Sequence, residues 1–249
     1  MQRYFVKGIV SETTHSLEFS KEQIYQLKKV MRMKVEEQFE IVDENSTLAI
    51  VELVCLEPFE VRVIKTLNQK VELPVFTAIA VGLSKGDKLD WIVQKATELG
   101  VNEIIPLELS RNVVKWNKDK ASKKTERLQK IAEEASEQSH RLKVPFVSEV
   151  MTIDSLIEYT KPYHQKLIAY EEAAKEGETV QLVKSLQALK EGEKIVFVFG
   201  PEGGIDEKEV AKLQMNEFHT CSLGPRILRA ETAPLYALSA LSYQCELLQ

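Results

Sequence analysis

Cysteine and histidine are scarce in this chain. Its 249 residues include three cysteines, Cys55, Cys221 and Cys245, and four histidines, all far apart in the sequence. An odd number of distant cysteines argues against a disulfide framework and favours a reducing compartment. Neither residue type shows the close spacing of zinc ligands, so we expect no metal ion.

Long apolar runs are also lacking. Nowhere do about 18 apolar residues follow one another, which is the length that a membrane-spanning helix needs. The N-terminus has no apolar stretch flanked by basic residues and no small-residue cleavage site. Apolar residues nevertheless make up 44% of the chain, enough for the core of one large or two small domains. We therefore expect a soluble, cytoplasmic protein without a membrane partner.

Positive charge is in deficit overall but is concentrated in one place. The formal net charge is −5, yet residues 111–130 contain eight basic and two acidic residues, a local charge of +6. Local clusters attract nucleic acid whatever the total charge is, and Trp116 in this run offers a ring for stacking on a base. The alternative is a solvated helix face. If the run binds RNA, the candidate contacts are Arg111, Lys115, Lys123, Lys124 and Arg127.

Residues 1–72 and residues 73–249 have different patterns, so we place a domain boundary between them. The first part has one helix-like stretch, residues 21–31, with Ser20 as a possible N-cap. It also contains short strand-like runs, at 38–42, 49–54 and 60–64. Several short strands in so few residues predict a small β-barrel.

After residue 72, strand patterns alternate with helical ones. Strands are predicted at 75–81, 103–107, 166–170, 194–199 and 218–223. Helices are predicted over 89–99, where Gly100 is a stop signal, around 128–135 and over 233–247. This alternation predicts an α/β domain with a mostly parallel sheet that is covered on both faces.

Two loops near the C-terminus carry the main candidate site. Residues 199–205 (FGPEGGI) and 223–234 (LGPRILRAETAP) each follow a buried strand, and open α/β sheets bind ligands at the carboxyl ends of their strands. Glycines there allow the backbone to approach a ligand. The first loop could also be a plain turn, because Asp206 and Glu209 form a possible capping box. A phosphate loop is less favoured, since the Lys-Ser/Thr pair is missing. The polar loop 171–177 also follows a strand, so three strand ends could meet at one pocket.

These residues resemble a known family. The pair FGPEGG and LGPRILRAETA, in this order, is similar to the signature of the SPOUT-class methyltransferases that methylate ring N3 of a uridine in 16S ribosomal RNA. The segments GDKLDWIVQKATELGV (86–101) and EEASEQSHRLKVP (133–145) are also similar, as are RYF and VMRM near the N-terminus. The likeness spans nearly the whole chain. Met31 and His140 depart from the family pattern, and neither lies in the two C-terminal loops.

The resemblance implies an N-terminal PUA-like barrel that binds RNA and a C-terminal trefoil knot in which loop 223–232 threads through another loop. It implies S-adenosylmethionine as the cofactor and a homodimer paired through the knot region. The last helix is apolar nearly all round, which fits such pairing, and the alternative is a larger core within a monomer. Carried over by motif position, the cofactor contacts are Gly200, Pro201, Glu202, Gly203, Gly204, Leu223, Gly224, Ile227, Leu228 and Ala233.

Catalysis would need a group that stabilises negative charge on the uracil ring, and Arg229 is the first candidate, with Arg226 behind it. Glu231 could accept the N3 proton, hold Arg229 in place or cap the final helix. Arg3, Arg32 and Arg141 are candidate RNA contacts, although Arg3 and Arg32 could equally form surface ion pairs. Two rival functions stay open. One is methylation of another RNA atom such as a ribose 2′-oxygen, and the other is a non-catalytic RNA-binding factor for ribosome assembly.

Overall fold

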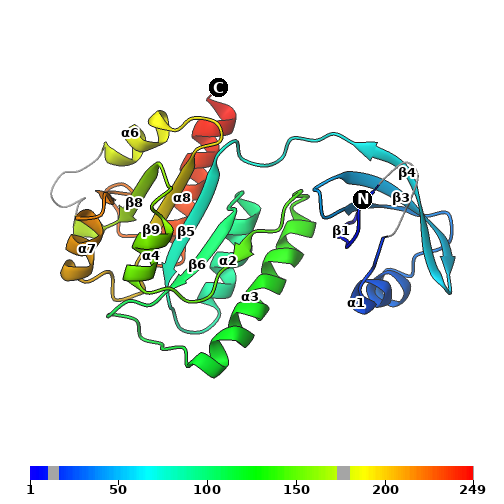
Figure 1. Ribbon diagram of the computed structural model, residues 1–249, viewed down its shortest axis with the longest axis horizontal. Coiled ribbons are helices and arrows are strands. Elements are labelled where there is room, and N and C mark those ends of the chain that lie inside the picture. Colours follow the sequence, from blue (N-terminus) through cyan, green and yellow to red (C-terminus); the bar gives the residue numbers. More distant parts are fainter. Residues whose placement is uncertain (11–16, 173–179, 249) are drawn as a thin grey trace. The chain divides into compact units, whose positions relative to one another are not determined.

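The computed structural model describes residues 1–10, 17–172 and 180–248, and the chain divides into two compact units (Figure 1). The first comprises Met1–Glu72 together with Ser136–Lys143, and the second comprises Leu73–Ala135 with Val144–Gln249. The predicted first domain, 1–72, does not include the segment Ser136–Lys143.

The N-terminal unit is built on a four-stranded sheet of order β1-β2-β3-β4. Its strands are β1 (Arg3–Phe5), β2 (Gln38–Val42), β3 (Leu48–Leu56) and β4 (Phe59–Leu67). Strand β1 runs parallel to β2, and the other two pairs are antiparallel. Tyr4, Leu27, Phe39 and Ile41 form the centre of its core. Strands β1 and β4 lie at opposite edges of this sheet, so closure into a barrel stays a prediction.

The helical stretch that follows β1 begins at the predicted N-cap. Helix α1 (Lys21–Tyr25) continues into the π-helical turn η1 (Gln26–Val30). The hydroxyl of Ser20 accepts a hydrogen bond from the backbone N–H of Gln23 at 3.1 Å, and the Gln23 side chain accepts one from the Ser20 N–H at 3.0 Å. This capping box satisfies two N–H groups that would otherwise lack partners.

The second unit contains a six-stranded sheet of order β10-β8-β9-β5-β6-β7, in which every pairing is parallel. The prediction of an α/β domain with a mostly parallel sheet is therefore confirmed. The strands are β5 (Phe76–Gly82), β6 (Glu103–Leu107), β7 (Phe146–Val147), β8 (Gln165–Ala169), β9 (Lys194–Phe199) and β10 (His219–Cys221).

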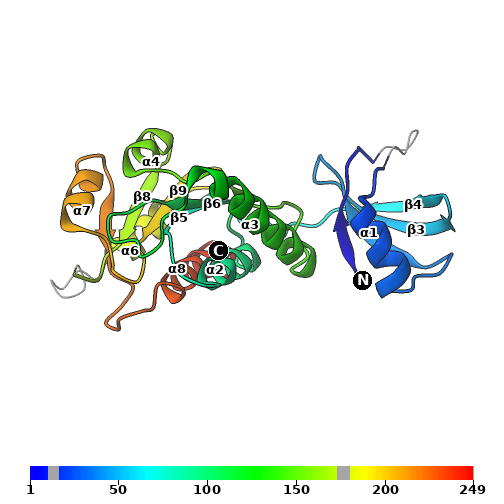
Figure 2. The same cartoon turned by 90° about the horizontal axis from the view of Figure 1, so that it is seen from below.

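Helices cover both faces of this sheet (Figure 2). The helices α2 (Lys88–Glu98), α3 (Lys118–Gln138), α6 (Gln181–Ala188) and α8 (Thr232–Ser242) contribute to one core cluster, and α4 (Ile153–Tyr159) and α7 (Glu207–Gln214) contribute to the other. Along β9, Phe197 and Phe199 point into the first cluster, and Val196 and Val198 point into the second. Alternate side chains of a strand face opposite ways, so a doubly covered strand is a continuous apolar run.

The helix ends follow local sequence signals. Helix α2 ends at Glu98, and Gly100 has φ of +89°, a left-handed conformation that glycine adopts at little cost. Helix α8 passes into a π-helical turn, η2 (Tyr243–Leu247), within the predicted span 233–247. Among the described residues, no helix combines the length and the apolar composition needed to cross a membrane.

Candidate active site

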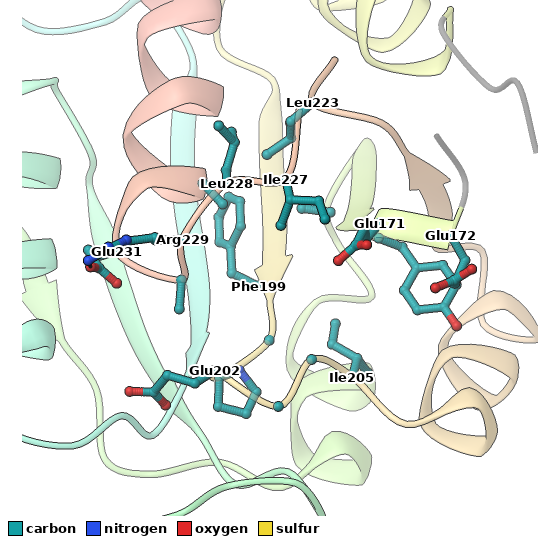
Figure 3. A pocket seen from close by; sticks show the side chains of 18 of the residues that line it. Glu171, Glu172, Phe199, Glu202, Ile205, Leu223, Ile227, Leu228, Arg229 and Glu231 are labelled. Carbon is teal, nitrogen blue, oxygen red and sulfur yellow. Dashed lines mark ion pairs between the residues drawn. The ribbon is translucent and has the colours of Figure 1, made fainter. Parts of the chain in front are cut away.

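A pocket of about 980 Å³ lies at the carboxyl ends of three neighbouring strands, β10, β8 and β9 (Figure 3). Its walls come from the loops that follow these strands, and Lys88 and Arg111 complete them. The expectation that three strand ends meet at one pocket is confirmed, because Glu171 and Glu172, which follow β8, also line the pocket. The rest of that predicted loop, 173–177, lies outside the described residues.

The glycine-rich loop after β9 turns so sharply that it needs glycine. A Cβ on Gly200 would lie 2.8 Å from the carbonyl carbon of Gly204, and Gly204 itself has φ of +72°. The loop then enters α7 through the predicted capping box. The Asp206 carboxylate accepts from the Lys208 N–H at 3.0 Å, and Glu209 accepts from the Asp206 N–H at 3.2 Å. The segment is thus a strand-to-helix turn and a pocket wall at once.

Arg111 packs against this loop. Its guanidinium donates to the carbonyl of Gly203 at 3.4 Å and pairs with Asp206 at 3.2 Å. A Cβ on Gly203 would lie 3.2 Å from the backbone oxygen of Arg111, so this glycine also makes room for Arg111. Arg111, predicted as an RNA contact, therefore supports the loop geometry.

The loop after β10 brings apolar and charged groups to the same pocket. Gly224 has φ of +96°, and its N–H donates to the hydroxyl of Ser222 at 3.1 Å. Figure 3 shows Phe199, Leu228 and Ile227 between two polar ends, with Arg229 and Glu231 on one side and Glu171 and Glu172 on the other. The pocket is thus apolar in the middle and charged at both ends, a usual arrangement for binding a small organic molecule.

Glu231 occupies the N-cap position of α8, but its side chain makes no capping hydrogen bond. The carbonyl of Arg229 instead accepts from the N–H groups of Thr232 and Ala233 at 2.9 and 3.0 Å. The interpretation of Glu231 as a helix cap is therefore wrong. One carboxylate oxygen of Glu231 lies 4.0 Å from the Arg229 guanidinium, and the other is buried without a hydrogen-bond partner.

Lys88, in the first turn of α2, is a pocket residue that sequence reasoning missed. Its ammonium nitrogen lies 2.8 Å from Glu202 Oε1 and 3.9 Å from Glu231 Oε2. The hydrogen bond to Glu202 raises the pKa of Lys88 above its ordinary value. Burial alone would raise the pKa of Glu202, but the hydrogen bonds from Lys88 and from backbone N–H groups outweigh it, so this pKa lies below its usual value. Both groups are thus charged at neutral pH. The available signal was that Lys88 starts a helix after the short loop that follows a buried strand.

All thirteen residues predicted for cofactor binding or catalysis line this pocket. They are Gly200, Pro201, Glu202, Gly203, Gly204, Leu223, Gly224, Ile227, Leu228 and Ala233 for the cofactor, and Arg226, Arg229 and Glu231 for catalysis. The structure brings them together, and their individual roles stay predictions. In the part of the chain that the structure describes, no group of three or more side chains is arranged to hold a metal ion.

Two of the predicted RNA contacts, Arg3 and Arg141, are buried in the N-terminal unit. Arg3 donates to Glu40 at 2.9 Å, to Gln69 at 3.1 Å and to the backbone carbonyls of His140 and Arg141. Arg141 pairs with Glu72. A phosphate contact needs an accessible guanidinium, so the structure does not support a direct RNA contact by either residue. The alternative of ion pairing applies to Arg3, although the pair is buried and not at the surface.

The other predicted RNA contacts differ in their exposure and in whether they already contact another side chain. Lys124 lies over the ring of Trp116, with its nitrogen 4.8 Å from the ring centroid, and Arg127 pairs with Asp90. Trp116 packs against the core, so its ring is only partly available for stacking. Arg32, Lys115 and Lys123 are exposed. Arg111 and Arg127 are exposed as well, but each forms an ion pair.

A family model described as an RNA methyltransferase domain matches residues 71–242. The chain belongs to this family. A relative from Bacillus subtilis, named ribosomal RNA small subunit methyltransferase E, is 44% identical, with 100% of this chain and 99% of the relative covered. A relative of the same name from Synechocystis is 30% identical and covers 88% of this chain and 70% of its own length.

Solved structures extend this likeness from the family model to the whole chain. A ribosomal RNA small subunit methyltransferase E from Neisseria gonorrhoeae, bound to S-adenosyl methionine, has a TM-score of 0.83 and 27% identity, with 97% of both chains covered. A methyltransferase from Legionella pneumophila, in complex with the same cofactor, has a TM-score of 0.85 and 29% identity, with 96% of both chains covered.

Proposed function

We propose that this chain is an S-adenosylmethionine-dependent methyltransferase that methylates ring N3 of a uridine in 16S ribosomal RNA. The observation that carries the proposal is the pocket at the ends of β8, β9 and β10, which gathers every residue predicted for the cofactor and for catalysis. The names of the relatives support a ribosomal RNA substrate, and the bound cofactor in two solved neighbours supports the methyl donor.

The pocket fits the cofactor by size and by chemistry. Its volume of about 980 Å³ is at the upper end of the usual range for small-molecule sites. Phe199 and Leu228 offer apolar surface to an adenine ring, and the glycine-rich loop offers backbone groups to its polar edges. When bound, the cofactor supplies an activated methyl group on a cationic sulfur. The protein then has to hold the target base in line with that methyl group.

Arg229 is the candidate for stabilising charge on the base. Uracil N3 is a weak acid, and removing its proton places negative charge on the flanking carbonyl oxygens. A guanidinium is always charged and donates in a planar fork, which suits those oxygens. The Arg229 side chain is 86% exposed, so it is free to reach a bound nucleotide. Arg226, also exposed at the rim, is the second candidate.

Glu231 is the candidate for receiving or loosening the N3 proton. One of its oxygens is buried in the pocket wall without a hydrogen-bond partner, and a carboxylate accepts a proton most readily where it has unused acceptor capacity. The nearby Lys88 and Arg229 keep the local charge balanced. Holding Arg229 in place is the alternative role, and the two are compatible.

The finer architecture belongs to the same proposal. We infer a trefoil knot through loop 223–232, a PUA-like RNA-binding barrel over residues 1–72 and a methyltransferase domain over residues 73–249. We also infer a cytoplasmic location and a homodimer paired through the last helix. The two sides of this helix support the pairing. One side is buried at Ala237, Leu238 and Leu241, while on the other Tyr236 is 40% and Tyr243 54% exposed.

Product analysis tests the proposal. The protein is incubated with small ribosomal subunits that lack the modification and with methyl-labelled cofactor, and the modified nucleoside is then identified. We expect label on uridine N3. Label on a ribose 2′-oxygen would establish the first rival function. Cofactor binding without any transfer, to subunits or to naked RNA, would favour an assembly factor.

A further inference from the structure

Four charged side chains line one end of the pocket and alternate in sign. Glu202 follows β9, Lys88 follows β5, and Glu231 and Arg229 belong to the loop before α8. The two carboxylates each approach the same ammonium, at 2.8 and 3.9 Å, so they lie near one another with Lys88 between them. Three chain segments that are distant in the sequence thus meet at a single cation.

We propose that Lys88 is a positioning residue that joins the two pocket loops by sharing its charge between Glu202 and Glu231. This inference rests on the proposed function, because the two pocket loops are the proposed walls of the cofactor site. Removing the ammonium would leave two carboxylates in proximity, and like charges repel more strongly where protein partly excludes water. The glycine-rich loop and the start of α8 would then separate, and the pocket between them would open.

The surroundings of Glu231 make this shared charge more consequential than an isolated surface pair. One Glu231 oxygen is buried without a hydrogen-bond partner, and the Lys88 ammonium lies 3.9 Å from it. The other oxygen lies 4.0 Å from Arg229. If Lys88 is lost, Arg229 is the one cation among the described residues that still pairs with Glu231, and that attraction would draw the guanidinium from the position proposed for the base. Lys88 therefore also affects how readily the Arg229 guanidinium can reach the target base.

The first test compares variants in the cofactor-free protein, by hydrogen exchange of peptides that cover residues 200–204 and 229–233. Lys88→Met should speed exchange in both peptides by about threefold to fivefold, near the upper end of what a partly exposed ion pair contributes. Lys88→Arg keeps the charge and should stay near wild type. Lys95→Met is the matched control, since Lys95 also lies on α2 and pairs with a carboxylate, Glu98, at 2.7 Å, away from the pocket. It should change neither peptide.

The second test asks whether charge or packing is responsible. Calorimetry with S-adenosylmethionine should show affinity weakened by about threefold to fivefold in Lys88→Met. Adding Glu202→Gln to that variant removes one repelling carboxylate while keeping its shape, and should return hydrogen exchange in both peptides of the cofactor-free protein to near the wild-type rate. A double variant that exchanges as fast as Lys88→Met would show that Lys88 acts through packing, and exchange and affinity within twofold of wild type in Lys88→Met would overturn the proposal.

These outcomes can be separated from a failure of the proposed function. If the wild-type protein binds the cofactor but does not methylate ribosomal RNA, the function is wrong while the exchange and affinity tests still decide the role of Lys88. If the wild-type protein does not bind the cofactor, the proposed function fails, and the exchange experiment on the cofactor-free protein still reports whether Lys88 joins the two loops.

Discussion

Two arginines, Arg3 in the N-terminal unit and Arg229 in the pocket, differ in almost every property of their surroundings. The Arg3 side chain is 1% exposed and binds one carboxylate, one amide and two backbone carbonyls. The Arg229 side chain is 86% exposed, and the Glu231 carboxylate with which it pairs lies at 4.0 Å. Both were candidates for contacting RNA or its target base. The difference teaches that a guanidinium whose donors are already used stabilises the fold, whereas one left accessible is available to a ligand.

The largest expected effect is on stability, at the buried arginine. Arg3→Met leaves the Glu40 carboxylate without its main partner, and breaking a buried pair in this way costs about 3–5 kcal/mol. Native-state hydrogen exchange of peptides from β2 and β3 measures the loss within the N-terminal unit. The matched control is Arg32→Met, which removes an exposed arginine of the same unit and should change stability by less than about 0.5 kcal/mol. Equal effects of the two variants would contradict the comparison.

The next effect is on rate, at the exposed arginine. Arg229→Ala should lower single-turnover methylation by about 10²-fold, the usual loss for a preorganised donor, with cofactor affinity much less changed. Its exposure predicts no measurable change in unfolding. Arg229→Lys keeps the charge without the planar fork and should recover part of the rate. If Arg226→Ala loses more activity than Arg229→Ala, the roles of the two arginines are exchanged.

A smaller effect is expected from the backbone that carries Arg229 into the pocket. Gly224→Ala forces an alanine to adopt φ of +96°, which costs about 1–2 kcal/mol. The added Cβ would not clash, because its nearest neighbouring atom lies 3.8 Å away. Cofactor affinity should therefore fall by roughly fivefold to thirtyfold in calorimetry. Gly192→Ala is the control, because Gly192 has φ of +82° and open space around it but does not line the pocket. Unchanged affinity in the Gly224 variant would mean that this loop conformation is not needed for binding.

The smallest effect tests the exposed lysines. Reversing Lys115 and Lys123 to glutamate should flatten the salt dependence of subunit binding, because each lost phosphate contact lowers the slope of log affinity against log salt by about 0.7–0.9. Lys124 and Arg127 are left intact because they contact Trp116 and Asp90. The control reverses Lys184 and Lys190, which changes the net charge equally. A wild-type slope in the Lys115 and Lys123 variant would identify that run as a solvated helix face.

Several strands were predictable in detail. The predicted bounds 38–42, 103–107 and 194–199 coincide with β2, β6 and β9, because each strand-like run is followed by a charged residue or by glycine. Strand β1 has three residues and β7 has two, too few to show a period. Helices α4 and α6 are also short and were not predicted.

The candidate site was predictable where its signal is local and not where it depends on distant partners. The resemblance of two short loops to a family signature indicated thirteen residues that share one pocket. Lys88 and Glu202 are 114 residues apart, and no local pattern links them. Arg3 reaches the carbonyl of His140, which is 137 residues away, so its burial was equally invisible. Charge alone suggested a surface role, and tertiary contacts decided otherwise.

The order of strands in the parallel sheet has a consequence for synthesis of the chain. Strand β5 pairs on one side with β6, soon after in the sequence, but its other neighbour is β9, where Phe76 aligns with Lys194. A ribosome needs on the order of ten seconds to add the intervening residues. During that interval, one edge of β5 lacks its hydrogen-bonding partner and its apolar faces lack their full cover. Because the pocket depends on β9, the nascent chain acquires its binding site only near the end of translation.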